Sequence, residues 1–494
     1  MNYISTRNKG YKVSAAEAIA RGLAPDGGLF VPETIPAISM DEIREMGNKS
    51  YQERAFVILK KYLSDFTEDE LKEIISASYG SNFDHDDITP LHFIDNNTAC
   101  LELWHGPTCA FKDLALQMLP HLLTRSLKKC GETREVCILV ATGGDTGKAA
   151  LDGFADVDGT KIIVFYPDDG VSNVQKLQMV TQIGDNVLVY AVKGNFDDAQ
   201  TGVKKIFGDK EFAGILSDRG YFLSSANSIN WGRLLPQIVY YFSAYCDFVN
   251  SGNIGWGDLL DYAVPTGNFG DILAGWYAKK MGLPVGNLIC CSNANNVLTD
   301  FLNTGKYNKN RPFYTTISPS MDILVSSNLE RLLFTVSSDD ELVSNLMQRL
   351  FAEGSYQVDE SVISEIRTDF RSGCCDDTET KDMIRKSYQE ENYLIDTHTG
   401  VAFRVLEHYR KENDTVPTVV LSTASPYKFC DSVLSALGKN VENCPGAELI
   451  NALHETTGVK APEPLKDLDK REIRFTGVTE KENMINVVDQ FLSK

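Results

Sequence analysis

The chain has 494 residues, of which 43% are hydrophobic, and its formal net charge is -20 at pH 7. This length exceeds what one hydrophobic core usually organises, so we expect two or three domains. The acidic balance argues against nucleic acid as a partner, because phosphate backbones would be repelled. An anionic small substrate would need its own local cluster of donors and cations.

The eleven cysteines do not form a disulfide framework or a metal site. Their number is odd, their close pairs are adjacent residues (Cys290 with Cys291, Cys374 with Cys375), and no C-x-x-C motif occurs. Buried thiols in a reducing cytosol are the simplest account. The first residues lack the apolar core of a signal peptide, and no window approaches 18 uninterrupted apolar residues. We expect a soluble, cytoplasmic protein with no bound metal and no membrane partner.

Residues 1–95 are predicted to be mainly helical. Amphipathic stretches occur at 15–23, 40–47, 51–64 and 68–78. After residue 95 the pattern changes to short apolar runs that alternate with helix-length segments, at 136–140, 162–165, 187–192, 262–264, 288–291 and 419–421. This alternation predicts parallel strands with crossover helices, and so an α/β protein.

Two helices are predicted within this α/β region. Ser172 and Gln175 form a capping-box pattern that opens a helix ending near Gly184. A long helix is predicted from Asn230 to about Phe248, with Pro236 as a possible kink. Its aromatic face is interpreted as core packing and not as a ring-binding site; that face comprises Tyr240, Tyr241, Phe242 and Tyr245.

Lys112 lies in an unusual setting for a lysine. It follows a Gly106-Pro107-Thr108 turn and stands between an aromatic ring, Phe111, and a carboxylate, Asp113. A lysine desolvated in this way loses its proton more easily and can act as an amine nucleophile, as Schiff-base chemistry requires. Asp113 either tunes this amine or starts a helix, and the acidic first turn favours the helix start.

The segment Gly267-Asn268-Phe269-Gly270-Asp271 follows an apolar run and opens a helical pattern. Its two glycines let backbone N–H groups approach an anion, and the helix N-terminus adds partial positive charge. The segment is therefore a candidate phosphate site. It matches neither the G-x-G-x-x-G pattern nor a Walker loop, which requires a lysine.

Two further strand ends carry small polar residues. Backbone amides with the hydroxyls of Thr142 and Thr146 suit a carboxylate, while the spacing from Gly143 to Gly147 is too short for an ATP-binding loop. Ser422 and Thr423 end another strand, at the sheet edge where α/β proteins bind ligands. A hydroxyl at that edge can hydrogen-bond a heteroaromatic nitrogen without protonating it.

In this order the segments resemble the threonine synthase family of fold-type II pyridoxal-phosphate enzymes, whose tryptophan synthase beta-like fold has open, mostly parallel sheets flanked by helices. The similarity runs over nearly the whole chain. The matching segments are 5–7, 22–33, 106–108 with 110–113, 225–234 and 267–271.

The resemblance implies roles for individual residues. Lys112 would bind pyridoxal phosphate covalently and move protons. Residues around the cofactor would be Gly267, Asn268, Phe269, Gly270 and Asp271 at its phosphate, Thr423 at its ring nitrogen and Asp145 near its ring oxygen. Residues around the substrate would be Thr142, Gly143, Gly144 and Thr146 at its carboxylate, and Asn227, Ser228, Asn230 and Arg233 at its phosphate, where an arginine fork fits well.

We expect an N-terminal domain at 1–95, a small α/β domain at 96–235 with Lys112, and a large α/β domain at 236–494 with the phosphate loop and Thr423. The oligomeric state would be a monomer or a homodimer. The family usually has serine at the position of Gly143 and often histidine at that of Ser425. The missing hydroxyl at 143 would cost about 1 kcal/mol of substrate binding.

The expected activity is that of a threonine synthase, which converts O-phospho-L-homoserine and water to L-threonine and phosphate by elimination and replacement. Two alternatives stay open. One is a phospholyase or dehydratase of the same cofactor class that releases a 2-oxo acid, a reading favoured only by Gly143. The other is a non-catalytic metabolite-binding paralogue, against which Lys112 and Thr423 argue.

Overall fold

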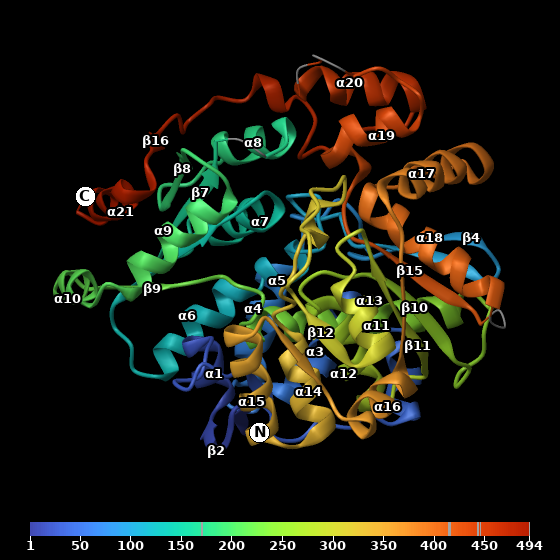
Figure 1. Ribbon diagram of the computed structural model, residues 1–494, viewed down its shortest axis with the longest axis horizontal. Helices are drawn as coiled ribbons and strands as arrows, with labels where there is room; N and C mark the ends of the chain where they lie inside the picture. Colours follow the sequence, from blue (N-terminus) through green and yellow to red (C-terminus); the bar gives the residue numbers. More distant parts are fainter. Residues whose placement is uncertain (169–170, 413–415, 442–443, 445, 494) are drawn as a thin grey trace.

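The computed structural model describes residues 1–168, 171–412, 416–441, 444 and 446–493. Two sheets flanked by helices form its upper left and right parts, and the N-terminal region lies below them (Figure 1). This arrangement confirms the predicted α/β class.

The N-terminal region combines helices with a small antiparallel sheet in the order β2-β1-β3. Its helices agree with the four predicted stretches, and three of them open with a capping box, at Ser39, Ser50 and Thr67. The sheet was not predicted, because two of its strands have only three residues each. The elements are β1 (Tyr3–Ser5), β2 (Asn8–Val13), α1 (Ala15–Arg21), β3 (Phe30–Pro32), α2 (Met40–Met46), α3 (Tyr51–Tyr62) and α4 (Glu68–Ser78).

The larger sheet has six strands in the order β14-β11-β10-β15-β5-β4. All neighbours are parallel except β4 and β5, which form an antiparallel pair. Three of these strands confirm predicted apolar runs, and every residue of β10 is buried. The strands are β4 (Leu91–Asp95), β5 (Thr98–Glu102), β10 (Leu260–Pro265), β11 (Val285–Ser292), β14 (Phe370–Cys374) and β15 (Thr418–Ser422).

The smaller sheet has five parallel strands in the order β16-β8-β7-β6-β9. Three of them, at its centre, confirm predicted runs. The strands are β6 (Glu135–Ala141), β7 (Thr160–Pro167), β8 (Val187–Val192), β9 (Tyr221–Ser224) and β16 (Val478–Thr479). A separate two-stranded sheet pairs β12 (Lys306–Asn308) with β13 (Ser355–Gln357).

The helices cover the faces of these sheets. In the first half of the α/β region they are α5 (Asp113–Leu116), α6 (Leu119–Lys129), α7 (Asp145–Phe154), α8 (Asn173–Val180), α9 (Phe196–Gly208), α10 (Lys210–Asp218), α11 (Trp231–Asn250) and α12 (Gly270–Met281). The later ones are α13 (Val297–Thr304), η1 (Pro319–Met321), α14 (Leu329–Ser337), α15 (Asp340–Ala352), α16 (Glu360–Asp369), α17 (Asp377–Glu391), α18 (Thr397–Glu412), η2 (Pro426–Phe429), α19 (Cys430–Ala436), α20 (Gly446–Thr457), η3 (Leu468–Lys470), η4 (Lys481–Asn483) and α21 (Met484–Leu492).

Helix α11 lies in the centre of the molecule (Figure 1). Its aromatic residues Tyr240, Tyr241, Phe242 and Tyr245 are fully buried, which confirms their interpretation as core. Helix α8 begins after Ser172, whose hydroxyl accepts from the Gln175 N–H, but it ends at Val180 and not near Gly184.

Sheet membership crosses the predicted domain boundaries in three places. Strands β4 and β5 lie in the larger sheet although they fall within 1–95 and 96–235, and β16 joins the smaller sheet although it falls within 236–494. The C-terminal segment runs along the top of the molecule from α20 to α21 (Figure 1). The three-domain division itself stays a prediction.

Eight of the eleven cysteines are buried, and all eleven are free thiols. No helix within the described part of the chain combines the length and the apolar character needed to cross a bilayer.

The turn that precedes Lys112 is anchored through His105. This imidazole lies between two carboxylates, with Nδ1 2.6 Å from Asp84 Oδ1 and Nε2 2.7 Å from Glu102 Oε2. Burial alone would lower the pKa of His105, but the two hydrogen-bonded carboxylates raise it to about 9. The protonated ring therefore holds the chain between β5 and Lys112.

This ion triad predicts a pH-dependent stability. The pKa of His105 is higher in the folded protein than its unfolded value of 6.5, so its protonation stabilises the fold. This contribution is fully present below pH 6.5 and disappears as the pH rises through about 9. We expect His105→Gln to lower the free energy of unfolding more at pH 7 than at pH 10, as measured by urea titration. An equal loss at both pH values would show that the ring acts by packing alone.

Candidate active site

Lys112 lies at the start of the short helix α5, directly after the turn that follows β5. Its Nζ donates to Ser320 Oγ at 3.3 Å and lies 3.9 Å from Asp145 Oδ2. Burial lowers the pKa of Lys112 to about 8; Asp145 opposes this shift, whereas Arg233 and Lys428 add to it. The unprotonated amine, which is the state a nucleophile or base requires, is therefore more abundant near neutral pH than in an ordinary lysine, while the ammonium form still predominates at pH 7.

Asp145 is the first residue of α7 and is only 5% exposed. Its Oδ1 lies 2.8 Å from Lys428 Nζ and accepts from Gln175 Nε2 at 2.9 Å, and its Oδ2 faces Lys112. Burial would raise the pKa of Asp145, but the Lys428 and Lys112 ammonium groups hold it below its ordinary value. The site thus contains one buried carboxylate between two lysines.

The loop before α7 is held by its own threonine. The Thr142 hydroxyl accepts hydrogen bonds from the N–H groups of Gly144 and Gly147, both at 3.0 Å. Its oxygen therefore stabilises the loop itself. Gly144 has φ +154°, a conformation that favours glycine, and a Cβ there would lie 2.6 Å from Gln175 Nε2. Gly143 is exposed, and a Cβ there would meet nothing nearer than Phe196 at 3.9 Å.

The candidate phosphate loop follows β10 and leads into α12. Phe269 adopts the left-handed conformation with φ 64°, which turns the chain into the first turn of the helix. The first N–H groups of a helix lack partners within it, so this turn offers donors to an anion. A Cβ on Gly267 would lie 2.8 Å from the Ser320 carbonyl oxygen, so only glycine fits there.

The Asp271 carboxylate points away from that turn. Its Oδ1 accepts from the hydroxyls of Tyr240 at 2.6 Å and Tyr241 at 2.8 Å. Burial raises the pKa of Asp271 to about 6. The aspartate therefore anchors the loop to α11, and only its backbone is placed to face an anion.

Ser320, which the sequence did not single out, joins the lysine to the phosphate loop. Its hydroxyl contacts Lys112 and lies 3.4 Å from Asp145 Oδ2, and its carbonyl lies against Gly267. Thr423 is brought to the same place, because its carbonyl accepts from the Phe111 N–H at 2.8 Å. The predicted lysine, carboxylate, glycine loop and strand end therefore converge.

Arg233 is a buried cation without a carboxylate partner among the described residues. Its Nη1 donates to the Ala226 carbonyl at 2.7 Å, while its Nε is buried and unpaired. Burial lowers the pKa of Arg233 to about 10. A buried guanidinium with an unpaired donor beside a lysine fits an anionic ligand.

The other residues predicted for the substrate phosphate divide into two groups. The Asn230 amide caps α11 through the Gly232 N–H at 2.8 Å and donates to the Ile19 carbonyl at 3.0 Å, so it is committed to structure. Ser228 Oγ lies 3.4 Å from Asn328 Nδ2, and Asn227 is exposed. Ser228 and Asn227 remain candidates for a ligand, as does Thr146 in the other loop.

Arg331 of α14, which is fully buried, connects the N-terminal region to this site. Its Nε donates to the Phe30 carbonyl at 2.9 Å, its Nη2 to the Ile229 carbonyl at 2.5 Å, and its Nη1 to Asn328 Oδ1. The Asn328 N–H in turn donates to the Asn268 carbonyl at 3.1 Å. One arginine thus joins β3, the segment before α11 and the phosphate loop.

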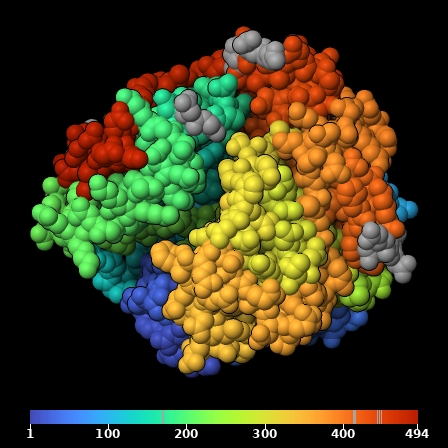
Figure 2. Space-filling model, in the orientation of Figure 1, coloured from blue at the N-terminus to red at the C-terminus, as the bar shows by residue number. Residues whose placement is uncertain are grey.

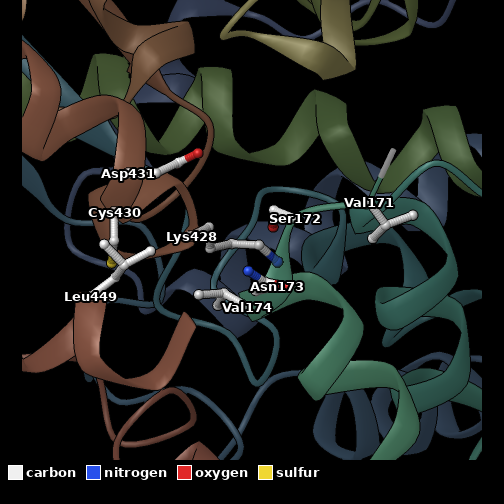
Figure 3. A pocket seen from close by; sticks show the side chains of 8 residues that line it. All are labelled: Val171, Ser172, Asn173, Val174, Lys428, Cys430, Asp431 and Leu449. Atoms are coloured by element: carbon white, nitrogen blue, oxygen red, sulfur yellow. The ribbon is translucent and has the colours of Figure 1, made fainter. Parts of the chain in front are cut away.

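On the molecular surface, a recess lies between the green part of the chain that contains α9 and the yellow part that precedes α14 (Figure 2). A cavity of about 160 Å³ lies between the start of α8 and α19. Figure 3 shows the Lys428 side chain extending toward Ser172 and Asn173 at the wall of this cavity. Lys428 therefore lines this cavity and also pairs with the Asp145 carboxylate.

These features fit a pyridoxal-phosphate cofactor: a buried amine of lowered pKa, a glycine loop too tight for a Cβ, and an unpaired buried guanidinium. Three family models cover the chain. They are "Threonine synthase N terminus" over residues 2–79, "Pyridoxal-phosphate dependent enzyme" over 89–424, and "Threonine synthase, C-terminal" over 399–491. The chain belongs to the threonine synthase family of pyridoxal-phosphate dependent enzymes.

Individual relatives agree with this family assignment. The chain is 37% identical over 526 residues to threonine synthase of Saccharomyces cerevisiae, covering 100% of this chain and 98% of the relative. It is 42% identical over 440 residues to human threonine synthase-like 1, covering 86% of this chain but 58% of that longer protein. The crystal structure of PLP-bound threonine synthase from Brucella melitensis is similar with a TM-score of 0.88 and 38% identity, covering 100% of this chain and 98% of the other.

Three residues at or beside this site were not found from the sequence. No glycine-rich turn or strand end marks Ser320 or His398, and Lys428 lies just beyond the strand end at Ser422 and Thr423 without a pattern of its own. The one available signal was the polar sequence Asp396-Thr397-His398-Thr399-Gly400 in an otherwise ordinary helix start.

The two glycines of the phosphate loop predict different responses to the same substitution. A Cβ at Gly267 would lie 2.8 Å from the Ser320 carbonyl, whereas one at Gly270 would meet nothing nearer than Asn328 Nδ2 at 3.5 Å. We expect Gly267→Ala to weaken pyridoxal-phosphate binding by about tenfold or more, because the clash displaces the loop. Gly270→Ala should change it much less. Fluorescence titration of both cofactor-free variants tests this; equal affinities would contradict the steric account.

Proposed function

We propose that this protein is a threonine synthase, which converts O-phospho-L-homoserine and water to L-threonine and phosphate with pyridoxal phosphate as cofactor. The observation that carries the proposal is the meeting of a buried amine, Lys112, with a glycine-rich anion loop and the unpaired guanidinium of Arg233. Two anion sites flanking one amine suit a phosphorylated cofactor and a phosphorylated substrate. The similarity to threonine synthases over the whole chain supports the same reaction.

The cofactor would be held by residues of three segments. Lys112 would bind it covalently, and the backbone N–H groups of residues 267–271 would bind its phosphate. Thr423 would face its ring nitrogen and Asp145 its ring oxygen. When bound, pyridoxal phosphate supplies an electron sink for the carbon next to the substrate's amine.

The chain's own residues would place and protonate the substrate. Arg233, with Ser228 and Asn227, would bind the substrate phosphate, and the loop from Thr142 to Thr146 would bind its carboxylate. The neutral form of the Lys112 amine would take the proton from the substrate's Cα, because its lowered pKa makes this form more abundant near neutral pH than in an ordinary lysine. A protonated Lys112 can return protons later in the reaction.

Water is needed late in this reaction, when it adds at Cβ, and must be excluded earlier. The recess between the α9 side and the segment before α14 suggests how this is achieved (Figure 2). Movement of the smaller domain toward that segment would close the site. We further propose a cytoplasmic enzyme, since its cysteines suit a reducing compartment. The predicted monomer or homodimer stays a prediction.

The decisive experiment combines the purified protein, pyridoxal phosphate and O-phosphohomoserine. We expect phosphate and threonine in equal amounts, and Lys112→Ala should abolish both, because no other amine occupies that position. Lys176→Ala, which removes a surface lysine, is the matched control and should retain activity. Phosphate released with a 2-oxo acid instead of threonine would overturn the synthase proposal in favour of a phospholyase.

Substitution at Gly143 tests the proposed carboxylate loop. A serine there has room for its side chain and would add a hydroxyl donor to the carboxylate loop. We expect Gly143→Ser to lower KM for O-phosphohomoserine about fivefold with little change in kcat, as one added hydrogen bond allows. Gly144→Ser, which clashes with Gln175, should instead lose activity. An unchanged KM in Gly143→Ser would show that position 143 does not contact the carboxylate.

A further inference from the structure

Ser320 sits on a loop that is itself held in place. Asn293 Nδ2 donates to Thr316 Oγ1 at 2.8 Å, Ser318 Oγ at 3.0 Å and Asp322 Oδ1 at 2.8 Å. The Thr316 N–H donates to the other Asp322 oxygen at 2.9 Å. These bonds fix both sides of the short helix η1, which carries Ser320.

The backbone of Ser320 has a second contact, to a buried histidine. The Ser320 N–H donates to His398 Nε2 at 3.2 Å, and His398 Nδ1 lies 2.7 Å from Asp396 Oδ2. Because a backbone N–H can only donate, Nε2 must be unprotonated and Nδ1 must carry the proton. His398 is 2% exposed and Asp396 is fully buried, so water does not compete for these bonds.

Asp396 is fixed in turn by the start of α18. Its Oδ1 accepts from the Thr399 N–H at 3.1 Å, and its Oδ2 accepts from the His398 N–H at 2.9 Å. Both oxygens therefore act as acceptors, which keeps the proton on His398 Nδ1. The neutral tautomer that Ser320 requires is thus imposed by the helix terminus.

The Ser320 hydroxyl transmits this placement to the reacting amine. It accepts from Lys112 Nζ at 3.3 Å and points its own hydrogen toward Asp145 Oδ2 at 3.4 Å. A hydroxyl can accept and donate at once, so it fits between an amine and a carboxylate. Among the described residues, Ser320 is the hydrogen-bond partner of this Nζ and Asp145 its ion-pair partner.

We propose that Asp396 and His398 are positioning residues that hold the Ser320 hydroxyl against Lys112 and so fix the direction of its amine. This inference rests on the proposed function, because that reaction moves protons at more than one substrate carbon. An amine that transfers protons at several carbons must stay correctly oriented between steps, because a small displacement of its nitrogen slows the reaction. Ser320 touches the reacting amine, while His398 acts only through Ser320.

A double-mutant cycle tests this order of action. We expect Ser320→Ala and His398→Ala each to lower kcat about tenfold with little change in KM, the equivalent of one lost hydrogen bond. The double variant should lose no more than Ser320→Ala alone, because His398 has no other route to the amine. Ser320→Thr, which keeps the hydroxyl, should recover most of the rate. Multiplied losses in the double variant would overturn the proposal.

A second measurement avoids turnover and cofactor altogether. In the cofactor-free protein, competitive labelling with acetic anhydride across pH reports the pKa of the Lys112 amine. We expect this pKa to fall in Ser320→Ala and in His398→Ala, since the ammonium form loses an acceptor. The control Ser318→Ala loosens the same loop without removing an atom beside Lys112, and its Lys112 pKa should stay at the wild-type value. Equal pKa shifts in all three variants would show that His398 and Ser320 only stabilise the loop, and would refute the proposal.

The tautomer can be read directly by nitrogen-15 NMR of histidine-labelled protein. We expect His398 to carry its proton on Nδ1, and Asp396→Asn to disturb this state and lower the Lys112 pKa as His398→Ala does. A protonated Nε2 in the wild type would exclude the bond to Ser320 and refute the proposal. If the wild type makes no threonine, the proposed function fails, while the labelling and NMR results still decide the placement of Lys112.

Discussion

The site depends on one buried carboxylate, Asp145, which lies between the ammonium groups of Lys112 and Lys428. Burying a charge is costly unless it is paired, and here one anion serves two cations from segments that follow β5 and β15 of the larger sheet. Because Asp145 begins α7, which follows a strand of the smaller sheet, the same pairing joins the two sheets. Burial and the nearby cations Arg233 and Lys428 keep the Lys112 amine easy to deprotonate, although Asp145 opposes this effect.

A second constraint comes from the N-terminal region. Arg331 binds carbonyls of β3 and of the segment before α11, and it orders Asn328 against the phosphate loop. Glu330, beside it, accepts from Thr6 and from Arg7 in a bidentate pair. The N-terminal region therefore belongs to the framework that shapes the anion sites, although none of the residues assigned to ligands comes from it.

The sequence predicted the α/β class, six strands, the N-terminal helices and the segments that surround Lys112, because turns rich in glycine and hydroxyl residues leave local patterns. It failed where a role depends on a distant partner. Nothing near Asp271 indicated that its carboxylate turns toward Tyr240 and Tyr241, and nothing near Asn230 indicated its bond to Ile19. The edge strands β9 and β16 were missed because four and two residues are too few to show a period.

The smaller sheet ends on strand β16, which pairs with β8 from almost 300 residues earlier in the chain. Helix α21 then packs on α9 so closely that a Cβ on Gly202 would lie within the volume of the Met484 sulfur. The ribosome therefore releases β6 to β9 long before their edge strand exists. During synthesis the smaller sheet therefore has an unpaired edge at β8 until β16 emerges, and an unpaired strand edge promotes aggregation of the nascent chain.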